Sequence, residues 1–173
     1  ARGKSMGRGI LFKGRWADAA EAPKAHPKAP FQLNFPMELP NWILNTLTMG
    51  IFNMGVYWSH WRRVARGMVD PFKFWYPLDR FTNWNRAYGS MGLTQHQCVL
   101  PDSADNGAVR RFLDVLTSHG GMSFLVVIKD CGPEGEGMLS FPRPGISIAM
   151  DMPVRPGTQA LIDALNEVVV KEG

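Results

Sequence analysis

The chain has 173 residues, of which 45% are hydrophobic and 20% are charged, with a formal net charge of +4. This length and composition favour one globular domain over a disordered chain. Residues 1–30 hold seven Lys or Arg and two acidic residues, a balance of +5, so the remaining residues carry about −1. Because no nucleic-acid-reading motif accompanies this basic segment, we expect no nucleic-acid partner.

The cysteines and histidines indicate neither a disulfide framework nor a metal site. Cys98 and Cys131 are far apart in the sequence, and the four histidines lack the spacing of metal ligands. Few cysteines are typical of a reducing compartment, so we expect a cytoplasmic location, with membrane association as an alternative. The opening "ARGKSMGRGI" shows no signal-peptide pattern, and the sequence starts with Ala. We therefore expect this chain to be a fragment of a larger protein.

The first half of the chain predicts little regular structure. Residues 7–16, "GRGILFKGRW", are bounded by glycines and predict a strand, and residues 17–41 predict a Pro-, Ala- and Lys-rich connector. Residues 42–91 form an aromatic, irregular region that predicts one or two short helices. Within it, residues 42–58 are too short and too polar for a membrane span. We favour a buried helix there; the alternative is contact with an anionic lipid surface through Trp58, Trp61, Arg62, Arg63 and Arg66.

The second half, residues 92–173, has clearer periodicity. It predicts strands over 93–100, 122–130 and 145–152 and helices over 103–119, capped by Ser103 or Asp105, and over 158–171. Residues 131–144 predict a turn in which "MLSF" could form a short strand. The fold class is therefore α+β, an antiparallel sheet with helices packed on one face, in a ferredoxin-like strand-helix-strand-strand-helix core that needs one further strand. We treat residues 1–173 as a single domain.

The alternation of side chains along the strands predicts two different sheet faces. Ile146, Ile148, Met150 and Met152 would meet the helices, and Ser147, Ala149 and Asp151 would lie on the opposite face. On that second face we also expect Gln95, Gln97, Leu125 and Lys129. Amides and an ammonium group among apolar walls suit a pocket for a hydroxylated ligand, although an antiparallel sheet face can also be polar and simply solvated. No motif of a catalytic triad, zinc protease or phosphate-binding loop is present, so we predict no catalytic residue in this chain.

Three stretches resemble one family in sequence order. They are "GRGILFKGR", "FWYPLDRFTNWNRAYGSMGLTQHQCVLP" and "MSFLVVIKDCGPEGEGMLSFPRPGISIAMDMP", followed by the closing helix. Together they are similar to the substrate domain of FAD-linked oxidases of the vanillyl-alcohol oxidase type. The resemblance is specific in "PLD-x-F-x-x-WNRAYG", "Q-x-Q-x-V-x-P" and "LSFP-x-PG", and it is weak over residues 17–70.

The resemblance implies a flavoprotein in which this chain is the substrate-binding cap. An N-terminal domain of the same protein would hold FAD, the flavin would accept hydride from a sugar-like or lipid-linked sugar alcohol, and a reductase partner would return it. By position, Trp75 stands where the family has a pocket tyrosine, and Leu78 matches a pocket leucine. The pair Gln95 and Gln97 also matches. The remaining matches are Leu125 and Lys129 on the second strand and, loosely, Trp58 at a mobile-loop tyrosine.

Four positions depart from the family pattern and imply a different pocket. Val126 and Cys131 replace an Asn and a Phe, and Ser147 and Ala149 replace an Asn and a Cys. The smaller side chains on the third strand imply a smaller pocket, so another alcohol could be oxidised by the same chemistry. The residues that bind FAD and the essential lysine of the family fall outside this chain. The alternative function is a non-catalytic ferredoxin-like module that binds a ligand or a partner.

Overall fold

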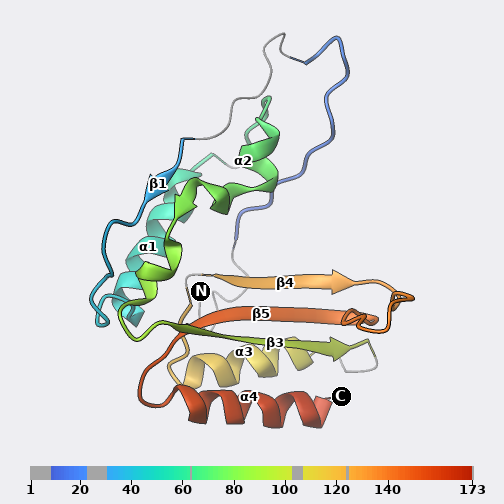
Figure 1. Ribbon diagram of the computed structural model, residues 1–173. Helices are drawn as coiled ribbons and strands as arrows, with labels where there is room; N and C mark the ends of the chain where they lie inside the picture. The colour runs from blue at the N-terminus through green and yellow to red at the C-terminus, as the bar shows by residue number, and fades with distance from the viewer. Residues whose placement is uncertain (1–8, 23–30, 63, 103–106, 124, 173) are drawn as a thin grey trace.

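The computed structural model describes residues 9–22, 31–62, 64–102, 107–123 and 125–172 (Figure 1). The N-terminal half contains short elements, and the C-terminal half contains longer strands and helices. In chain order the elements are β1 (Leu33–Asn34), α1 (Thr46–Ser59), α2 (Pro71–Trp75), η2 (Pro77–Arg80), β2 (Phe81–Thr82), η3 (Trp84–Tyr88), β3 (Leu93–Pro101), α3 (Ala108–Ser118), β4 (Val126–Cys131), β5 (Gly145–Pro153) and α4 (Thr158–Glu172).

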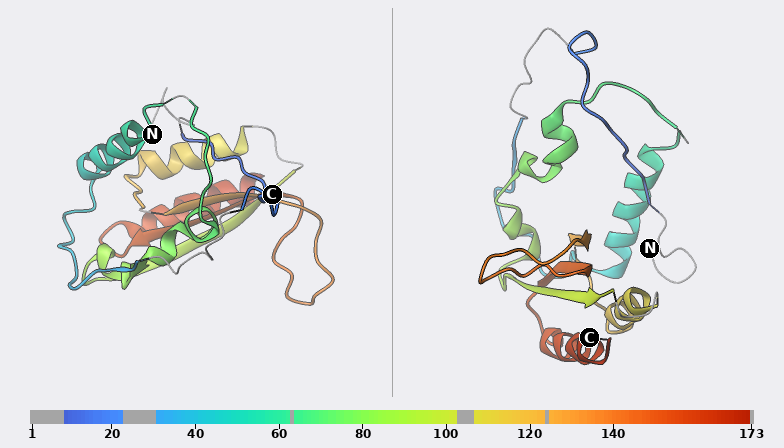
Figure 2. Two further views of the ribbon diagram at one scale, coloured as in Figure 1. Left: turned by 90° about the horizontal axis from the view of Figure 1, so that it is seen from above. Right: turned by 90° about the vertical axis from the view of Figure 1, so that its right-hand side faces the viewer.

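The main sheet contains β3, β5 and β4 in that order, with both pairs antiparallel. The central strand is β5, which pairs along its whole length with β3. The three strands lie between α1 and α2 on one side and α3 and α4 on the other (Figures 1 and 2). The predicted α+β class and the order strand, helix, strand, strand, helix are confirmed.

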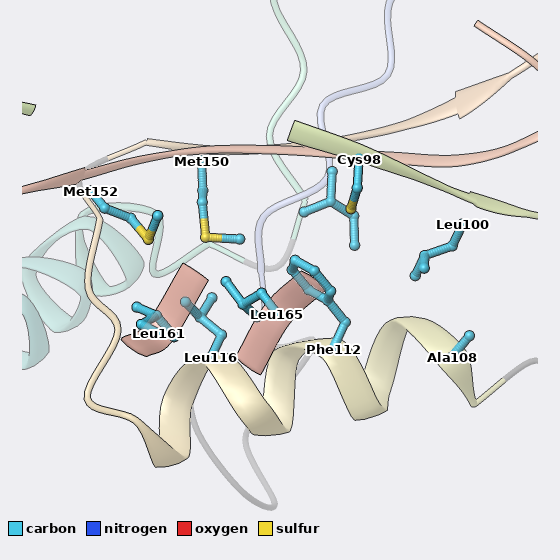
Figure 3. Close-up of a cluster of buried hydrophobic side chains, with 10 residues drawn as sticks. Cys98, Leu100, Ala108, Phe112, Leu116, Met150, Met152, Leu161 and Leu165 are labelled. Atoms are coloured by element: carbon cyan, nitrogen blue, oxygen red, sulfur yellow. The ribbon is translucent and has the colours of Figure 1, made fainter. Parts of the chain in front are cut away.

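The hydrophobic core lies between this sheet and the two C-terminal helices. Ile148, Met150 and Met152 are almost completely buried, and Phe112 and Leu165 from α3 and α4 have no exposed surface. Figure 3 shows the side chains of the strands and helices pointing toward one another. Ile146 packs at the edge of the same cluster. The prediction that alternate residues of residues 145–152 meet the helices is confirmed, because period-two alternation leaves one apolar face to cover.

Two boundaries in the C-terminal half differ from the prediction, and one suggested strand is absent. The helix predicted over 103–119 begins only at Ala108, after Gly107, and its predicted caps Ser103 and Asp105 lie outside the described residues. The strand predicted from residue 122 begins at Val126; before it, the Ser123 hydroxyl accepts from the N–H of Leu125 and donates to its carbonyl oxygen, and such local bonds compete with strand pairing. The strand suggested at "MLSF" is absent, since residues 138–141 are turn and coil.

The strand predicted over residues 7–16 is wrong for its described part, residues 9–16, which has no regular structure. A strand needs a neighbour for its backbone hydrogen bonds, and this segment instead makes side-chain contacts. The Phe12 ring lies edge-on to His60 at 5.7 Å, and the Trp16 ring lies 6.5 Å from Trp75. The predicted connector, residues 17–41, contains one short strand, β1, which pairs in parallel with β2.

The buried helix favoured for residues 42–58 is also wrong in this structure. The segment does form a helix, α1, whose N-cap Asn45 accepts hydrogen bonds from the N–H groups of Leu47 and Thr48. No residue of α1 is buried, however, and Leu47 is 70% exposed. Among the helices of the described residues, none has the length and apolar character needed to cross a bilayer.

The segment before β3 has a structural role. Tyr88 at the end of η3 is 3% exposed and stacks edge-on with Trp84. The Arg86 guanidinium donates to the carbonyl oxygens of Phe35 and Pro36 at 2.9 and 3.0 Å, which ties the connector to η3. These contacts fix the chain as it enters β3, the strand that carries the predicted glutamines.

Candidate substrate-binding face

The strand register places most of the predicted site residues on one face of the main sheet. Gln97 lies opposite Ala149 of β5, and Lys129 of β4 lies opposite Ser147. Residues directly opposite each other in a sheet point to the same side. Gln95 shares this face by its spacing from Gln97. The structure therefore brings together five predicted residues from three strands.

Leu125 lies beside this group, just before β4 begins. Its carbonyl oxygen accepts a hydrogen bond from the N–H of Asp151 at 3.3 Å, so the backbone of Leu125 already lies beside β5. Its side chain is half-buried. Leu125 thus supplies an apolar border to the group formed by the glutamines, Lys129, Ser147 and Ala149, which we call the polar face.

The polar face combines long exposed side chains with a floor of small ones. Gln95, Gln97 and Lys129 are exposed, Ala149 is half-buried and Ser147 is only 5% exposed. Amide groups both donate and accept hydrogen bonds, and an ammonium group donates three. Such a face can bind hydroxyl groups or an anionic oxygen, with the small central residues leaving space for a ring.

A buried carboxylate orients one of the two glutamines. Asp151 is 3% exposed, and its Oδ1 accepts a hydrogen bond of 2.8 Å from the Nε2 of Gln95. This bond uses the donor side of the Gln95 amide and leaves its oxygen to accept from another group. The sequence pattern placed Asp151 on this face but did not identify this bond. The alternation in "GISIAMDM" could have signalled it, since a single acid in an apolar strand requires a partner.

Trp75 and Leu78, in contrast, do not lie with the polar face. Trp75 ends α2 and Leu78 lies in η2, and Figures 1 and 2 show α2 well separated from the main sheet. The Trp75 ring contacts Phe74 at 5.1 Å and Trp16 at 6.5 Å. The expectation that rings from this segment cover the polar face is therefore not met, because they pack against the N-terminal segment instead.

Two surface hollows occur elsewhere on the described residues. One of about 230 Å³ is formed by the aromatic side chains around α2 and is lined by Trp16, Pro71, Phe72, Trp75 and Tyr76. The other, of about 490 Å³, is a wide depression on α4 lined by Asp163, Asn166, Glu167, Val170 and Lys171. Neither hollow includes a residue of the polar face.

His96 and Cys98 have structural surroundings. The Nε2 of His96 lies 3.0 Å from the Oδ1 of Asn166, on the helix side of the sheet. Burial raises the pKa of Cys98 to about 11, which keeps this thiol protonated and unreactive near neutral pH. Within the described residues, no group of three or more His, Cys, Asp or Glu could hold a metal ion.

The glycine-rich turn of this chain does not suit a dinucleotide. A pyrophosphate is usually held by a glycine-rich loop between a strand and the N-terminus of a helix. Here Gly132, Gly135 and Gly137 lie in the turn between β4 and β5, with no helix after it. This turn therefore does not have the form of a pyrophosphate-binding loop.

The comparisons with known proteins support the resemblance seen in the motifs. No family model matches the chain. The chain is 33% identical to decaprenylphosphoryl-beta-D-ribose oxidase of Mycolicibacterium smegmatis, over 97% of its own length. It spans only 37% of the length of that oxidase. The resemblance of the quoted motifs to an FAD-linked oxidase, the oxidase subunit of decaprenylphosphoryl-ribose epimerase, is thus confirmed.

Proposed function

We propose that this chain is the substrate-binding domain of an FAD-dependent oxidoreductase that oxidises a sugar-like or lipid-linked alcohol. The observation that carries the proposal is the similarity to an oxidase along 97% of the chain. The polar face adds a chemical reason, because it offers amides and one ammonium group around small side chains, which suits a hydroxylated ring.

Each residue of the polar face has a role in this proposal. Gln97 and the free oxygen of Gln95 bond hydroxyl groups of the substrate, and Ser147 donates from the floor. Lys129 makes a charge-assisted bond to a hydroxyl or a phosphate oxygen. Ala149 leaves room for the ring and Leu125 borders it. Trp75 and Leu78 remain predictions from the resemblance, and they require α2 and η2 to approach the sheet in the complete protein.

The redox chemistry belongs to the cofactor. An N-terminal domain of the same protein would hold most of the FAD, which would supply hydride acceptance from the substrate carbinol. The polar face orients the carbinol carbon and keeps the sugar ring in one position. A reductase partner, which the resemblance implies, and a cytoplasmic or membrane-associated location complete the proposal.

The experiment uses the full-length protein that contains this chain. We expect it to be yellow, with bound FAD, and to lose flavin absorbance when mixed anaerobically with a polyprenyl-phosphate sugar. Gln97→Ala and Lys129→Met should each raise KM about 10- to 100-fold, the value of one hydrogen bond involving a charged or well-placed polar group. Lys171→Met on α4, an exposed residue distant from the polar face, is the matched control and should leave KM unchanged. A full-length protein without flavin would refute the proposal and favour the ligand-binding module.

A further inference from the structure

The most apolar surface of the chain is formed by α1 and the turn after it. We call it the α1 surface and define it by its exposed side chains: Leu47, Ile51, Phe52, Trp58 and Trp61. Ile51 and Phe52 are more than half exposed, and both tryptophans are more exposed still. The helix contains no charged residue, and apolar side chains point out in several directions around it. A helix that is hydrophobic all round is normally covered.

The helix is attached to the folded core only near its N-terminal end. Leu44, just before the helix, is 3% exposed, and its carbonyl oxygen accepts a hydrogen bond from Arg155 at 3.3 Å. The Thr46 hydroxyl lies 3.7 Å from the sulfur of Met122. From there α1 leads away from the sheet, on the side opposite α3 and α4 (Figures 1 and 2). At the C-terminal end of α1 the His60 ring meets Phe12, but Trp58 and Trp61 remain 62% and 72% exposed and can meet another surface.

Positive charge follows the apolar helix directly. The sequence has no Asp or Glu between Glu38 and Asp70, whereas Arg62 and Arg66 are both exposed. The Arg62 guanidinium lies 5.4 Å from the centre of the Trp61 ring. The ion pairs found among the described residues use Arg15 and Arg111 as cations, so neither Arg62 nor Arg66 has an acidic partner there.

We propose that the α1 surface docks on the anionic headgroup region of a lipid bilayer. Its 14 residues give a length of about 21 Å, shorter than the apolar core of a bilayer at about 30 Å, so α1 enters one leaflet and does not span. Tryptophans next to arginines are typical of the boundary between lipid chains and headgroups. The apolar side chains of the α1 surface thus fit the lipid-chain layer of one leaflet, and the arginines fit its headgroup layer.

The charge pattern favours lipid over a second copy of the chain. Two copies pairing through the α1 surface would bring the same arginines close together without an acid to neutralise them, which opposes association. Phosphate groups of an anionic leaflet provide that neutralisation. The proposal does not depend on the oxidoreductase activity, since it uses only the apolar and basic residues of this surface.

Vesicle flotation of the full-length protein tests the proposal. One vesicle population contains phosphatidylcholine alone, and in the other about a third of the lipid is phosphatidylglycerol. We expect flotation with the anionic vesicles, much weaker flotation with the neutral ones, and a decrease in high salt. Replacing both arginines, Arg62→Gln with Arg66→Gln, should weaken partitioning about 30-fold, because each basic residue near such a surface contributes about fivefold.

Two further variants make the test specific. Ile51→Ser with Phe52→Ser should abolish flotation through loss of apolar contact, and circular dichroism should remain unchanged because both side chains are exposed. Arg110→Gln with Lys171→Gln removes the same charge from exposed positions on α3 and α4 and should float like the wild type. Equal loss in this control, or no flotation of the wild type, overturns the proposal. Two other results overturn it as well. One is a dimer of the wild type that the α1 variants abolish, and the other is a Trp58 that another part of the protein shields in the absence of lipid.

Discussion

The bond between Gln95 and the buried carboxylate of Asp151 yields the sharpest prediction of stability. Replacing Gln95 by Leu removes the amide that donates to the Asp151 Oδ1 at 2.8 Å and leaves a carboxylate that is 3% exposed without this donor. Hydrogen bonds to charged groups contribute about 1.5–3 kcal/mol, and a buried acceptor left unpaired loses this in full. We therefore expect the opening free energy of the main sheet to fall by about 1.5–3 kcal/mol.

The double variant separates this bond from simple packing. When Asp151→Leu is combined with Gln95→Leu, both polar partners become apolar, and the cost should be smaller than the sum of the two single changes. Asp151→Asn is the conservative control. Its amide oxygen can still accept from Gln95, so about half of the stabilisation by this hydrogen bond should remain, as expected for a neutral bond compared with a charge-assisted one.

Hydrogen exchange measured on the peptides of β3 and β5 is the assay. It reports local opening of the sheet in the full-length protein and does not require the whole protein to unfold in one step. A loss of 1.5–3 kcal/mol corresponds to exchange that is about 12- to 150-fold faster in Gln95→Leu. Unchanged exchange in that variant, or strictly additive effects in the double variant, would show that the bond does not hold the sheet.

Three other predictions concern the core. Phe112→Ala should lower the free energy of unfolding by about 3–5 kcal/mol and markedly reduce the melting temperature, whereas Val170→Ala, 81% exposed, should change it little. Burial raises the pKa of Cys98 to about 11 from an ordinary value near 9, so between these pH values the folded state keeps a proton that the unfolded state loses. The free energy of unfolding should therefore fall as the pH rises from about 9 to 11. Cys98→Ala should remove this fall when denaturation is measured across the same pH range. Gly145→Ala should destabilise by more than about 1 kcal/mol in thermal melts, since its φ of +147° disfavours a side chain and its new Cβ would meet the Leu100 carbonyl oxygen; a neutral result would contradict this.

The sequence predicted the C-terminal half well because its elements complete one another. The stripe of Val109, Phe112 and Leu116 predicts a helix with one apolar side, and the alternation in residues 145–152 predicts a strand with one apolar face. These two faces cover each other in the core. Side-chain parity then placed Gln97 and Lys129 on the opposite face, because period-two alternation survives small errors in strand boundaries.

The N-terminal half could not be predicted in the same way. Its apolar residues lack a regular period, and they contact one another as rings, for example Phe12 with His60 and Trp16 with Trp75. Ring contacts of this kind depend on tertiary arrangement and leave no repeat in the sequence. For the same reason the sequence could not show that Trp75 packs away from the sheet.

The two halves also differ in how their apolar surface is covered. The C-terminal half has a cluster of ten buried residues, whereas Leu44 and Tyr88 are the buried hydrophobic residues among the described positions before Gly92. Burial of apolar surface supplies most of the stability of a domain, so the arrangement of α1, α2 and η2 depends on what covers them. If α1 enters a leaflet, the segment between α1 and β3 is anchored at both ends, by lipid at the helix and by Arg86 at η3. Trp75 and Leu78 lie between these anchors. If both proposals hold, the approach of these two residues to the polar face would be coupled to membrane docking, and a lipid-linked substrate would meet both at the same surface.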